Sequence, residues 1–536
     1  MISRPTGSDL DVIAEALGWF HLTDDDRGDF VEMADKVLGV IDLVDSAGAM
    51  FESANTVIPA HRDAGRRADQ SEDPLNAIVR WCSVRPNESG DDLRDMRLAI
   101  KDSVAIAGIP MTLGSATFQD FTPTIDSVVT ERLLQAGAQI VATTNLDAFA
   151  FSGGADTSDN GWTSNPHDPE RSAGGSSGGS AAGLYYREVI DAAIGCDQGG
   201  SIRLPSAWCG VVGLKPTHGL VPYTGIGGID QTFDHAGPIT RTVLDAARLL
   251  AVIAGAHPSD PRQASIPEWN GKELLDRVGK ATSAKNLSGV KIGIMSEGFS
   301  RDDDLRAGNS DAVLNFVNKL KDLGATVINI SVPAHSFAGG IAFAGFIEGM
   351  HAGLRGGGNG FHWKGTYWPE FGQQVADALV KKGQLLPAQI KIVALVGEHL
   401  GRLHGGSIYA RAQNQRPGLI RAFDDALGEV DFLLTPTAPY PAFRLHDELS
   451  LAERVMRGWE PLGNTAPTDM SGHPAISLPV ASLDGLPVGA MLIAKHFSDT
   501  PLLELSAKIE HLIGWDSCTQ ERLKKSLGPN THPTIT

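Results

Sequence analysis

From about residue 96 onward, the chain alternates short runs of β-forming residues with longer stretches of helical periodicity. The short runs are apolar and predict strands at 97–106, 139–144, 191–196, 290–295, 326–332, 431–436 and 489–494. The amphipathic stretches between them predict helices at 126–137, 241–255, 310–324 and 500–513. Asp126 is the expected N-terminal cap of the first helix, and Ser310 and Gly324 mark the expected start and end of the third. This alternation is typical of an α/β fold in which helices flank a large mixed, mostly parallel sheet.

A small helical unit is expected before this body. Apolar residues recur at three- and four-residue spacing through 9–56, which predicts helices there. The next stretch, 61–74, is almost wholly polar and is expected to be an exposed linker. The chain would then consist of a helical extension with its linker at 1–73 and a main domain at 74–525. Within that domain, the Gly-, His- and Trp-rich segment 336–420 is either a cap over a pocket or a helical insertion with a surface loop.

The charge balance and the cysteines exclude several classes of protein. With 45 Lys and Arg against 64 Asp and Glu, the formal net charge is −19, which argues against a nucleic-acid or anionic-membrane surface. The four cysteines form no CxxC pair and have no histidine at metal-ligand spacing, so neither a disulfide framework nor a zinc site is predicted. The sequence has no signal-peptide pattern and no apolar run of membrane-spanning length. We therefore expect a soluble cytoplasmic protein without a metal.

Two glycine-rich clusters stand out, GGSSGGS at 174–180 and GCDQGGSIR at 195–203. Neither contains the Walker or dinucleotide-binding pattern, so a phosphate-binding loop has little support. Residues 174–178 match the GxSxG nucleophile motif of α/β-hydrolases. That motif requires a preceding apolar strand, however, and the preceding residues are polar and rich in proline.

The second cluster has a better context for a nucleophile. Ser201 follows two glycines at the end of an expected strand, where neighbouring backbone N–H groups could stabilise an oxyanion. A serine hydroxyl needs a base to take its proton. Lys101 lies within a β-like apolar run, where a charged side chain is rarely buried without a partner or a task. The alternative for Lys101 is an edge-strand lysine that faces water.

Taken together, AIKDS at 99–103, GGSSGGSAA at 174–182, GCDQGGSIRLP at 195–205 and GVVGLKPT at 210–217 resemble the amidase signature family. The similarity is ordered along the chain and extends over about 75–510. Within the family, the sequence looks most like the bacterial amidases associated with nitrile breakdown, which also have a helical N-terminal extension. The resemblance implies the amidase signature fold and the hydrolysis of a small-molecule amide without a metal or organic cofactor.

The resemblance also implies roles for individual side chains. Ser201 would be the nucleophile, Ser176 the bridging serine that follows a cis peptide after Gly175, and Lys101 the final proton acceptor. Ser176 and Ser201 are separated by one position more than is usual in the family, which makes Ser177 a rival for the bridging role. The lysine must be neutral near pH 7, although the usual pKa is about 10.4, and burial among small residues would lower it.

The loop before the nucleophile has implied roles as well. The backbone amides of Gln198, Gly199 and Gly200 would form the oxyanion hole, and Asp197 and Arg203 would brace the loop. In the implied cycle, the nucleophile attacks the amide carbonyl while its proton passes through the bridging serine to the lysine. The bridging serine then protonates the leaving nitrogen, and water releases the acyl group.

Substrate preference rests on three side chains that the resemblance assigns to the pocket: Phe151, Gln198 and Phe233. Such a pocket would favour aryl or medium aliphatic primary amides. For the two phenylalanines, ordinary core packing is the alternative.

Other functions and partners stay open at this stage. One is the glutaminase subunit of a tRNA-dependent amidotransferase, which needs partner subunits; another is a non-catalytic binding protein that keeps the fold. A Ser-His-Asp mechanism would have to use His167, His218 or His235, each of which also fits a loop or a satisfied polar position. The apolar stripe of the N-terminal helices suggests a homodimer.

Overall fold

The computed structural model describes residues 2–44, 57–88, 90–263, 265–358, 360–445 and 448–513. The chain forms two compact units, Met1–Thr56 and Val57–Thr536. The first contains α1 (Gly7–Leu17) and α2 (Arg27–Ile41). A reciprocal capping box of Thr6 and Asp9 starts α1, and Gly18 ends it in the left-handed conformation. The predicted helices are confirmed up to residue 44, and the remainder of 9–56 lies outside the described residues.

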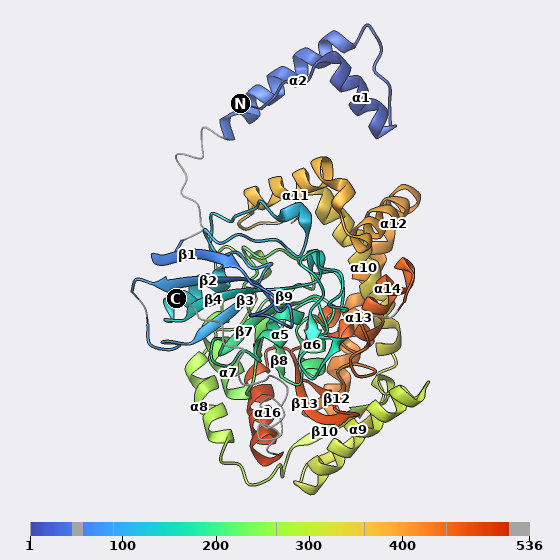
Figure 1. The fold of residues 1–536 in the computed structure, drawn as a ribbon. Coiled ribbons are helices and arrows are strands. Elements are labelled where there is room, and N and C mark those ends of the chain that lie inside the picture. Colours follow the sequence, from blue (N-terminus) through green and yellow to red (C-terminus); the bar gives the residue numbers. More distant parts are fainter. Residues whose placement is uncertain are drawn as a thin grey trace. The chain divides into compact units, whose positions relative to one another are not determined.

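The second unit is built on a twelve-stranded sheet (Figure 1). In spatial order the strands are β1 (Ala60–Arg67), β2 (Ile78–Pro86), β4 (Gln139–Thr144), β3 (Arg97–Lys101), β7 (Ala192–Asp197), β9 (His235–Thr240), β8 (Val212–Lys215), β13 (Ala475–Leu483), β14 (Leu486–Ile493), β12 (Phe432–Pro436), β10 (Lys291–Met295) and β11 (Thr326–Ile330). A separate ribbon pairs β5 (Ser164–Asn165) with β6 (Asp168–Ser172). All seven predicted strands are present.

The mixed sheet is confirmed, but the expectation that it is mostly parallel is wrong. Parallel pairing is confined to β4–β3–β7 and β12–β10–β11, and the other neighbours are antiparallel. At the β13–β14 hairpin the reason is local. Asp484 and Gly485 both have positive φ, the geometry of a tight hairpin turn, and Asp-Gly is a strong sequence signal for it.

The predicted linker at 61–74 also needs correction, because its first half is the edge strand β1. Its side chains are half-buried or exposed, and several of them are charged, including Arg62, Arg66 and Arg67. A polar, charged edge strand resists pairing with other molecules, so its sequence is similar to that of a loop. The compact unit that contains the sheet begins at Val57 and therefore includes β1.

The predicted helices are confirmed, with two shifts at their starts. Ser127 caps α4 by accepting from the N–H of Thr130, whereas the Asp126 carboxylate binds the guanidinium of Arg62 on β1. The helix predicted from Ser310 begins earlier, with Asp303 as its cap. Five helices pack in one apolar core with strand residues that include Leu98 and Ile100 of β3. They are α4 (Val128–Gln135), α7 (Val243–Ile253), α8 (Gly271–Ala281), α9 (Asp304–Asp322) and α16 (Asp499–Ile513).

Alternation along β3 places Lys101 on the opposite face. Leu98 and Ile100 pack into the core with α4 and α7, while Ala99 packs with the alanines of α5 (Gly178–Gly183). Because side chains alternate across a strand, Lys101 shares the face of Ala99. The α5 helix, which follows the serine doublet, covers that face.

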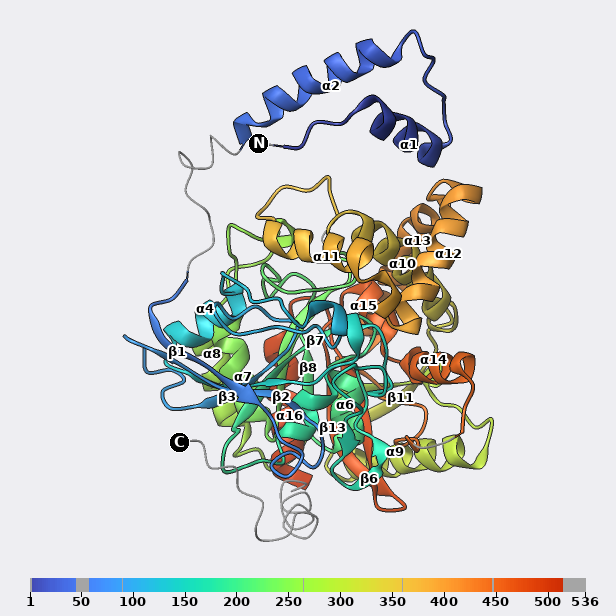
Figure 2. The same ribbon diagram turned by 45° about the horizontal axis from the view of Figure 1, so that its top comes forward.

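The segment expected to be a cap or an insertion folds into four helices, α10 (His335–Arg355), α11 (Pro369–Lys381), α12 (Ala388–His404) and α13 (Ser407–Glu429). Figures 1 and 2 show them gathered away from α7, α8 and α16. By length and composition alone, α10 could span a membrane, a test that core helices also pass. Phe346, Ile347 and Met350 of α10 are buried in the apolar core shared with α11, α12 and α13.

Candidate active site

Lys101 and Ser176 meet between the sheet and α5. The Nζ of Lys101 lies 2.8 Å from the Oγ of Ser176, and neither residue is accessible to solvent. The peptide bond between Gly175 and Ser176 is cis, as the resemblance implied. Among the residues that the structure describes, Ser176 is the only hydrogen-bond partner of the Lys101 amine. The contact joins two of the predicted catalytic side chains directly.

Glycine at 179 is required by the close approach of α5 to neighbouring backbone. A Cβ at Gly179 would lie 2.3 Å from the carbonyl oxygen of Ala77 and 2.5 Å from the nitrogen of Asn145. A side chain there would push α5 away from the backbone at Ala77 and Asn145. This packing accounts for part of the glycine cluster that follows the serine doublet.

The hydroxyl of Ser177 is held elsewhere. Its Oγ donates to the carbonyl of Cys196 at 3.1 Å and accepts from the Cys196 N–H at 3.3 Å. Both contacts attach Ser177 to the backbone of β7. The structure therefore brings Ser176, and not Ser177, to Lys101.

Ser201 lies in the turn between β7 and α6 (Arg203–Cys209) and is 4% exposed. Its carbonyl accepts from the N–H of Ser177 at 3.2 Å, so the backbones of the two serine-containing turns are in contact. Within the described part of the chain, the Ser201 hydroxyl itself has no hydrogen-bond partner.

The turn before Ser201 differs from the sequence-based expectation at Gly200. The Gly200 N–H donates to Oδ1 of Asp197, and its φ of 137° lies in the region that favours glycine. This donor is therefore already used within the loop and is not free for an oxyanion. In the described residues, no acceptor is present for the backbone N–H of Gln198, Gly199 or Ser201.

A buried ionic network holds this loop in place. The Arg203 guanidinium binds Asp197 at 2.9 Å and Asp469 of α15 (Ala466–Ser471) at 2.6 Å, with all three side chains fully buried. Burial alone would raise the pKa of Asp197, but the attraction of Arg203 and Lys215 keeps it below its usual value. The family resemblance implied supporting roles for Asp197 and Arg203. Asp469 is far away along the chain and was not predicted.

Burial of Lys101 shifts its amine toward the neutral form. Complete burial lowers the pKa of the Lys101 amine, and attraction by Cys196, Asp147 and Asp197 opposes this lowering without reversing it. Burial also raises the pKa of Asp147 to about 7, with repulsion by Asp156 adding to the effect. A buried amine with a lowered pKa is a suitable proton acceptor near neutral pH.

An aromatic cluster, defined here as Phe151, Phe233, Phe343, Phe346 and Trp459, lies beside the loop. Phe346 contacts both Phe151 and Phe233 edge-to-face. Its ring would lie 3.1 Å from a Cβ at Gly199, so it packs directly against the turn that leads to Ser201. Of these five residues, only Phe151 and Phe233 were predicted from the sequence. Phe346 belongs to α10 and Trp459 to α14 (Leu451–Trp459), and only tertiary packing brings them here.

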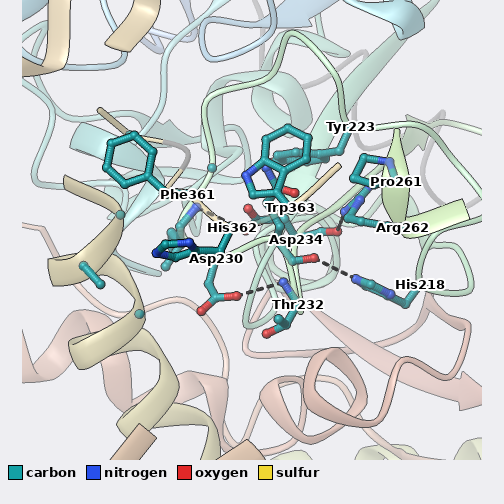
Figure 3. A pocket seen from close by; sticks show the side chains of 18 of the residues that line it. His218, Tyr223, Asp230, Thr232, Asp234, Pro261, Arg262, Phe361, His362 and Trp363 are labelled. Carbon is teal, nitrogen blue, oxygen red and sulfur yellow. Dashed lines mark hydrogen bonds between the residues drawn. The ribbon is translucent and has the colours of Figure 1, made fainter. Parts of the chain in front are cut away.

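A cavity of about 990 Å³ lies next to this region, between the 220–235 loop and the helices of 336–420. Its labelled lining in Figure 3 includes Tyr223, Asp230, Asp234, Arg262, Phe361 and Trp363. Lys101, Ser176 and Ser201 are not among its described lining residues. The connection is Gln198, whose Nε2 donates to the hydroxyl of Tyr223 at 2.8 Å. The Gln198 Oε1 is buried and has no partner in the described structure.

The histidines considered for a rival mechanism have other neighbours. His235 lies with Nδ1 at 2.7 Å from the Phe233 carbonyl and Nε2 at 3.2 Å from Lys215. His218 contacts the carbonyl of Gln231, and His167 contacts the hydroxyl of Tyr185. Each of these contacts fits the structural role that was the alternative for that residue.

Comparison with known proteins identifies one family. The amidase family model matches residues 83–503. An enantioselective amidase of Rhodococcus rhodochrous is 37% identical over 451 residues, which is 83% of this chain and 84% of the relative. A subunit of the glutamyl-tRNA(Gln) amidotransferase of Prochlorococcus marinus is also 37% identical, over 80% of this chain and 85% of its own length. The crystal structure of a peptide amidase from Stenotrophomonas maltophilia superposes with a TM-score of 0.66 at 25% identity, covering 82% of this chain and 89% of that one.

Proposed function

The chain belongs to the amidase signature family, and from that premise we propose that it hydrolyses carboxamides through an acyl-enzyme on Ser201. The products are a carboxylic acid and ammonia or an amine. The observation that carries this proposal is the contact of 2.8 Å between the buried amine of Lys101 and the hydroxyl of Ser176. A buried lysine beside a serine hydroxyl can take a proton that a second serine releases on attack.

In the proposed cycle, the Oγ of Ser201 attacks the amide carbonyl while its proton passes to Ser176 and the proton of Ser176 passes to Lys101. The N–H groups of Gln198, Gly199 and Ser201, which are not used within the loop, stabilise the oxyanion. Ser176 then donates a proton to the leaving nitrogen and regains one from Lys101, so that the C–N bond breaks. Water attacks the acyl-enzyme by the same proton route and regenerates the Ser201 hydroxyl.

The two neighbouring serines give a matched pair of variants. Ser176→Ala is expected to lower kcat by about 10²- to 10³-fold, because the proton route from Ser201 to Lys101 is interrupted. Ser177→Ala is expected to keep kcat within a few-fold and to lower the free energy of unfolding by about 1–3 kcal/mol, because it removes buried hydrogen bonds to β7. Steady-state kinetics and chemical denaturation of both variants check the assignment. A larger kcat loss in Ser177→Ala would transfer the bridging role to Ser177.

We propose aryl or medium aliphatic amides as substrates. The aromatic cluster supports this choice, because Phe346 packs against Gly199 beside the proposed oxyanion donors and Phe151 contacts both Phe346 and Trp459. In this proposal an apolar acyl group packs against these rings, which are buried in the structure, and gains free energy from leaving water. A panel of benzamide, propionamide, glutamine and the matching esters, given to the purified chain alone, tests the proposal by ammonia release. Absence of turnover with every amide would contradict it.

The second candidate function is the glutaminase subunit of a tRNA-dependent amidotransferase. Relatives with that name reach the same identity as the enantioselective amidase, which is the reason to retain it. The same panel separates the candidates, because a free-standing amidase hydrolyses benzamide or propionamide unaided, whereas the subunit would act on glutamine together with partner subunits. A non-catalytic binding protein would hydrolyse none of these amides.

We also propose that the protein is a cytoplasmic homodimer assembled partly through its first unit. Large apolar side chains of that unit are exposed, including Val12, Trp19, Val37 and Val40, with Trp19 81% exposed. Light scattering is expected to give the mass of a dimer for the full chain and of a monomer for a chain that begins at residue 57 and so keeps β1. If both proteins contained the same number of chains per particle, dimerisation through this unit would be contradicted.

A further inference from the structure

Three side chains that are distant in the sequence converge where α13 packs on the sheet-containing body. They are Asp424 of α13, His473 just after α15, and His496 just after β14. The Nε2 of His473 lies 3.1 Å from Oδ1 of Asp424, and the Nδ1 of His496 lies 3.9 Å from the same oxygen. Three potential ligand atoms, one per residue, lie within 4.8 Å of one another.

Hydrogen bonds on the far side of each ring orient these atoms. The Nε2 of His496 lies 2.9 Å from the carbonyl oxygen of Ser471, which can only accept, so this nitrogen carries the hydrogen. In the neutral ring, Nδ1 then presents its lone pair toward Asp424. The Nδ1 of His473 lies 2.9 Å from the Oγ of Ser471, a hydroxyl that can donate or accept. Without an ion, the Nε2–H of His473 donates to the Asp424 carboxylate at 3.1 Å. Transfer of this hydrogen to Nδ1, where the Ser471 hydroxyl can accept it, would free Nε2 to bind a metal ion.

This arrangement is the one found around metal-binding histidines, in which the other ring nitrogen donates to a carbonyl or another acceptor of the protein. Ser471 serves both rings, one through its carbonyl and the other through its hydroxyl. Gly472, with φ of 80°, makes the turn between Ser471 and His473, and a Cβ there would lie 3.3 Å from the Nε2 of His496. The backbone at Ser471 and Gly472 therefore fixes the separation of the two rings.

We propose that Asp424, His473 and His496 bind a divalent first-row transition-metal ion, of which Zn²⁺ is the example to test. Two imidazole nitrogens and one carboxylate oxygen suit such an ion better than Mg²⁺ or Ca²⁺, which prefer oxygen ligands only. With metal–ligand bonds of about 2.0–2.2 Å, ligand atoms in a tetrahedral site lie roughly 3.3–3.6 Å apart. The two separations from the Asp424 oxygen are 3.1 and 3.9 Å, and the two imidazole nitrogens lie within 4.8 Å of each other, so the side chains would move closer together around a bound ion.

An ion can reach this site, because the Asp424 side chain is 48% exposed and His496 lines the 990 Å³ cavity. Water or a ligand in the cavity would complete the coordination. The Nζ of Lys215 donates to the His473 carbonyl at 2.7 Å. The positive charge of this side chain repels a metal cation, so electrostatic attraction alone would not hold an ion here. This repulsion therefore adds to the preference for an ion that bonds strongly to imidazole. The bound ion would link α13 to the segments that follow α15 and β14.

The test uses the purified full chain after chelator treatment and desalting. Isothermal titration with Zn²⁺ is expected to show one equivalent bound, and Co²⁺ is expected to give visible absorption bands of a site with nitrogen and oxygen ligands. Asp424→Asn and His496→Gln are each expected to weaken Zn²⁺ binding about tenfold or more. His404→Ala, which removes an exposed histidine of α12 outside the cluster, is the matched control and is expected to bind as the parent does.

Thermal unfolding gives a second measurement that does not depend on activity. Zn²⁺ is expected to raise the Tm of the parent and of His404→Ala, and to raise that of Asp424→Asn clearly less at the same Zn²⁺ concentration, because the stabilisation by a bound ion falls as its affinity falls. Asp424→Asn changes an exposed side chain, so its fold is expected to persist. Absence of stoichiometric binding in the parent, or equal binding in all four proteins, would overturn the proposal.

Discussion

Ser201→Ala is expected to reduce amide turnover by about 10⁴-fold or more and to abolish stoichiometric labelling by a fluorophosphonate. Without the hydroxyl, no acyl-enzyme can form, whatever the state of Lys101 and Ser176. The folded state should lose little, because the Ser201 hydroxyl has no hydrogen-bond partner in the described structure and no buried group is left unpaired. Intact-protein mass spectrometry after labelling, together with kcat and Tm, measures all three consequences.

Ser206→Ala is the matched control for this result. Ser206 belongs to α6, close to Ser201 in the chain, and its hydroxyl donates to the carbonyl of Ile202 within the helix. This variant is expected to keep the full labelling stoichiometry. Labelling that persists in Ser201→Ala and maps to Ser176 would instead identify Ser176 as the nucleophile.

Lys101→Met is expected to lower kcat by about 10³- to 10⁴-fold while leaving the protein as stable as the parent, or more stable, near neutral pH. The rate falls because methionine keeps the apolar volume but cannot accept the proton of Ser176. Stability is retained because burial penalises the ammonium form of Lys101 in the folded state, and the variant no longer has that penalty.

The direction in which the pKa of Lys101 is shifted determines how the stability difference between the parent and Lys101→Met changes with pH. The folded-state pKa of Lys101 lies below its usual value, so between the two pKa values the unfolded chain binds more protons. The penalty is complete below the folded-state pKa and is lost as the pH rises toward about 10.4. The stability advantage of Lys101→Met should therefore be largest at low pH and shrink as the pH rises.

The pH dependence of kcat/KM should also report the protonation of Lys101. In the parent, kcat/KM is expected to rise with pH as Lys101 loses its proton, with the midpoint below the usual lysine value of about 10.4. This rise should be missing from the residual activity of Lys101→Met. Turnover that survives the substitution with the same pH profile would exclude lysine as the base.

Much of the fold was predictable from local patterns. Apolar periodicity identified the seven expected strands and the helices between them, since both reflect repeats over a few neighbouring residues. It did not identify β1, because an edge strand with a charged face resembles a loop, and it did not give the direction of strand pairing. The Asp484-Gly485 turn did contain a local signal for an antiparallel hairpin, which the alternation of strands and helices obscured.

Sequence by itself determined which residue types could do the chemistry, because the serines, the lysine and the glycines that allow close backbone approach lie in short ordered motifs. Only the tertiary structure decided which of them meet. In the folded chain Ser177 is hydrogen-bonded to β7, and the Gly200 N–H is hydrogen-bonded within its own loop. Folding also brings Asp469 to Arg203, Phe346 to Phe151, and the three residues Asp424, His473 and His496 to one another, each from distant parts of the chain. The physical reason is that motifs record local backbone requirements, whereas contacts across hundreds of residues depend on how sheet and helices pack.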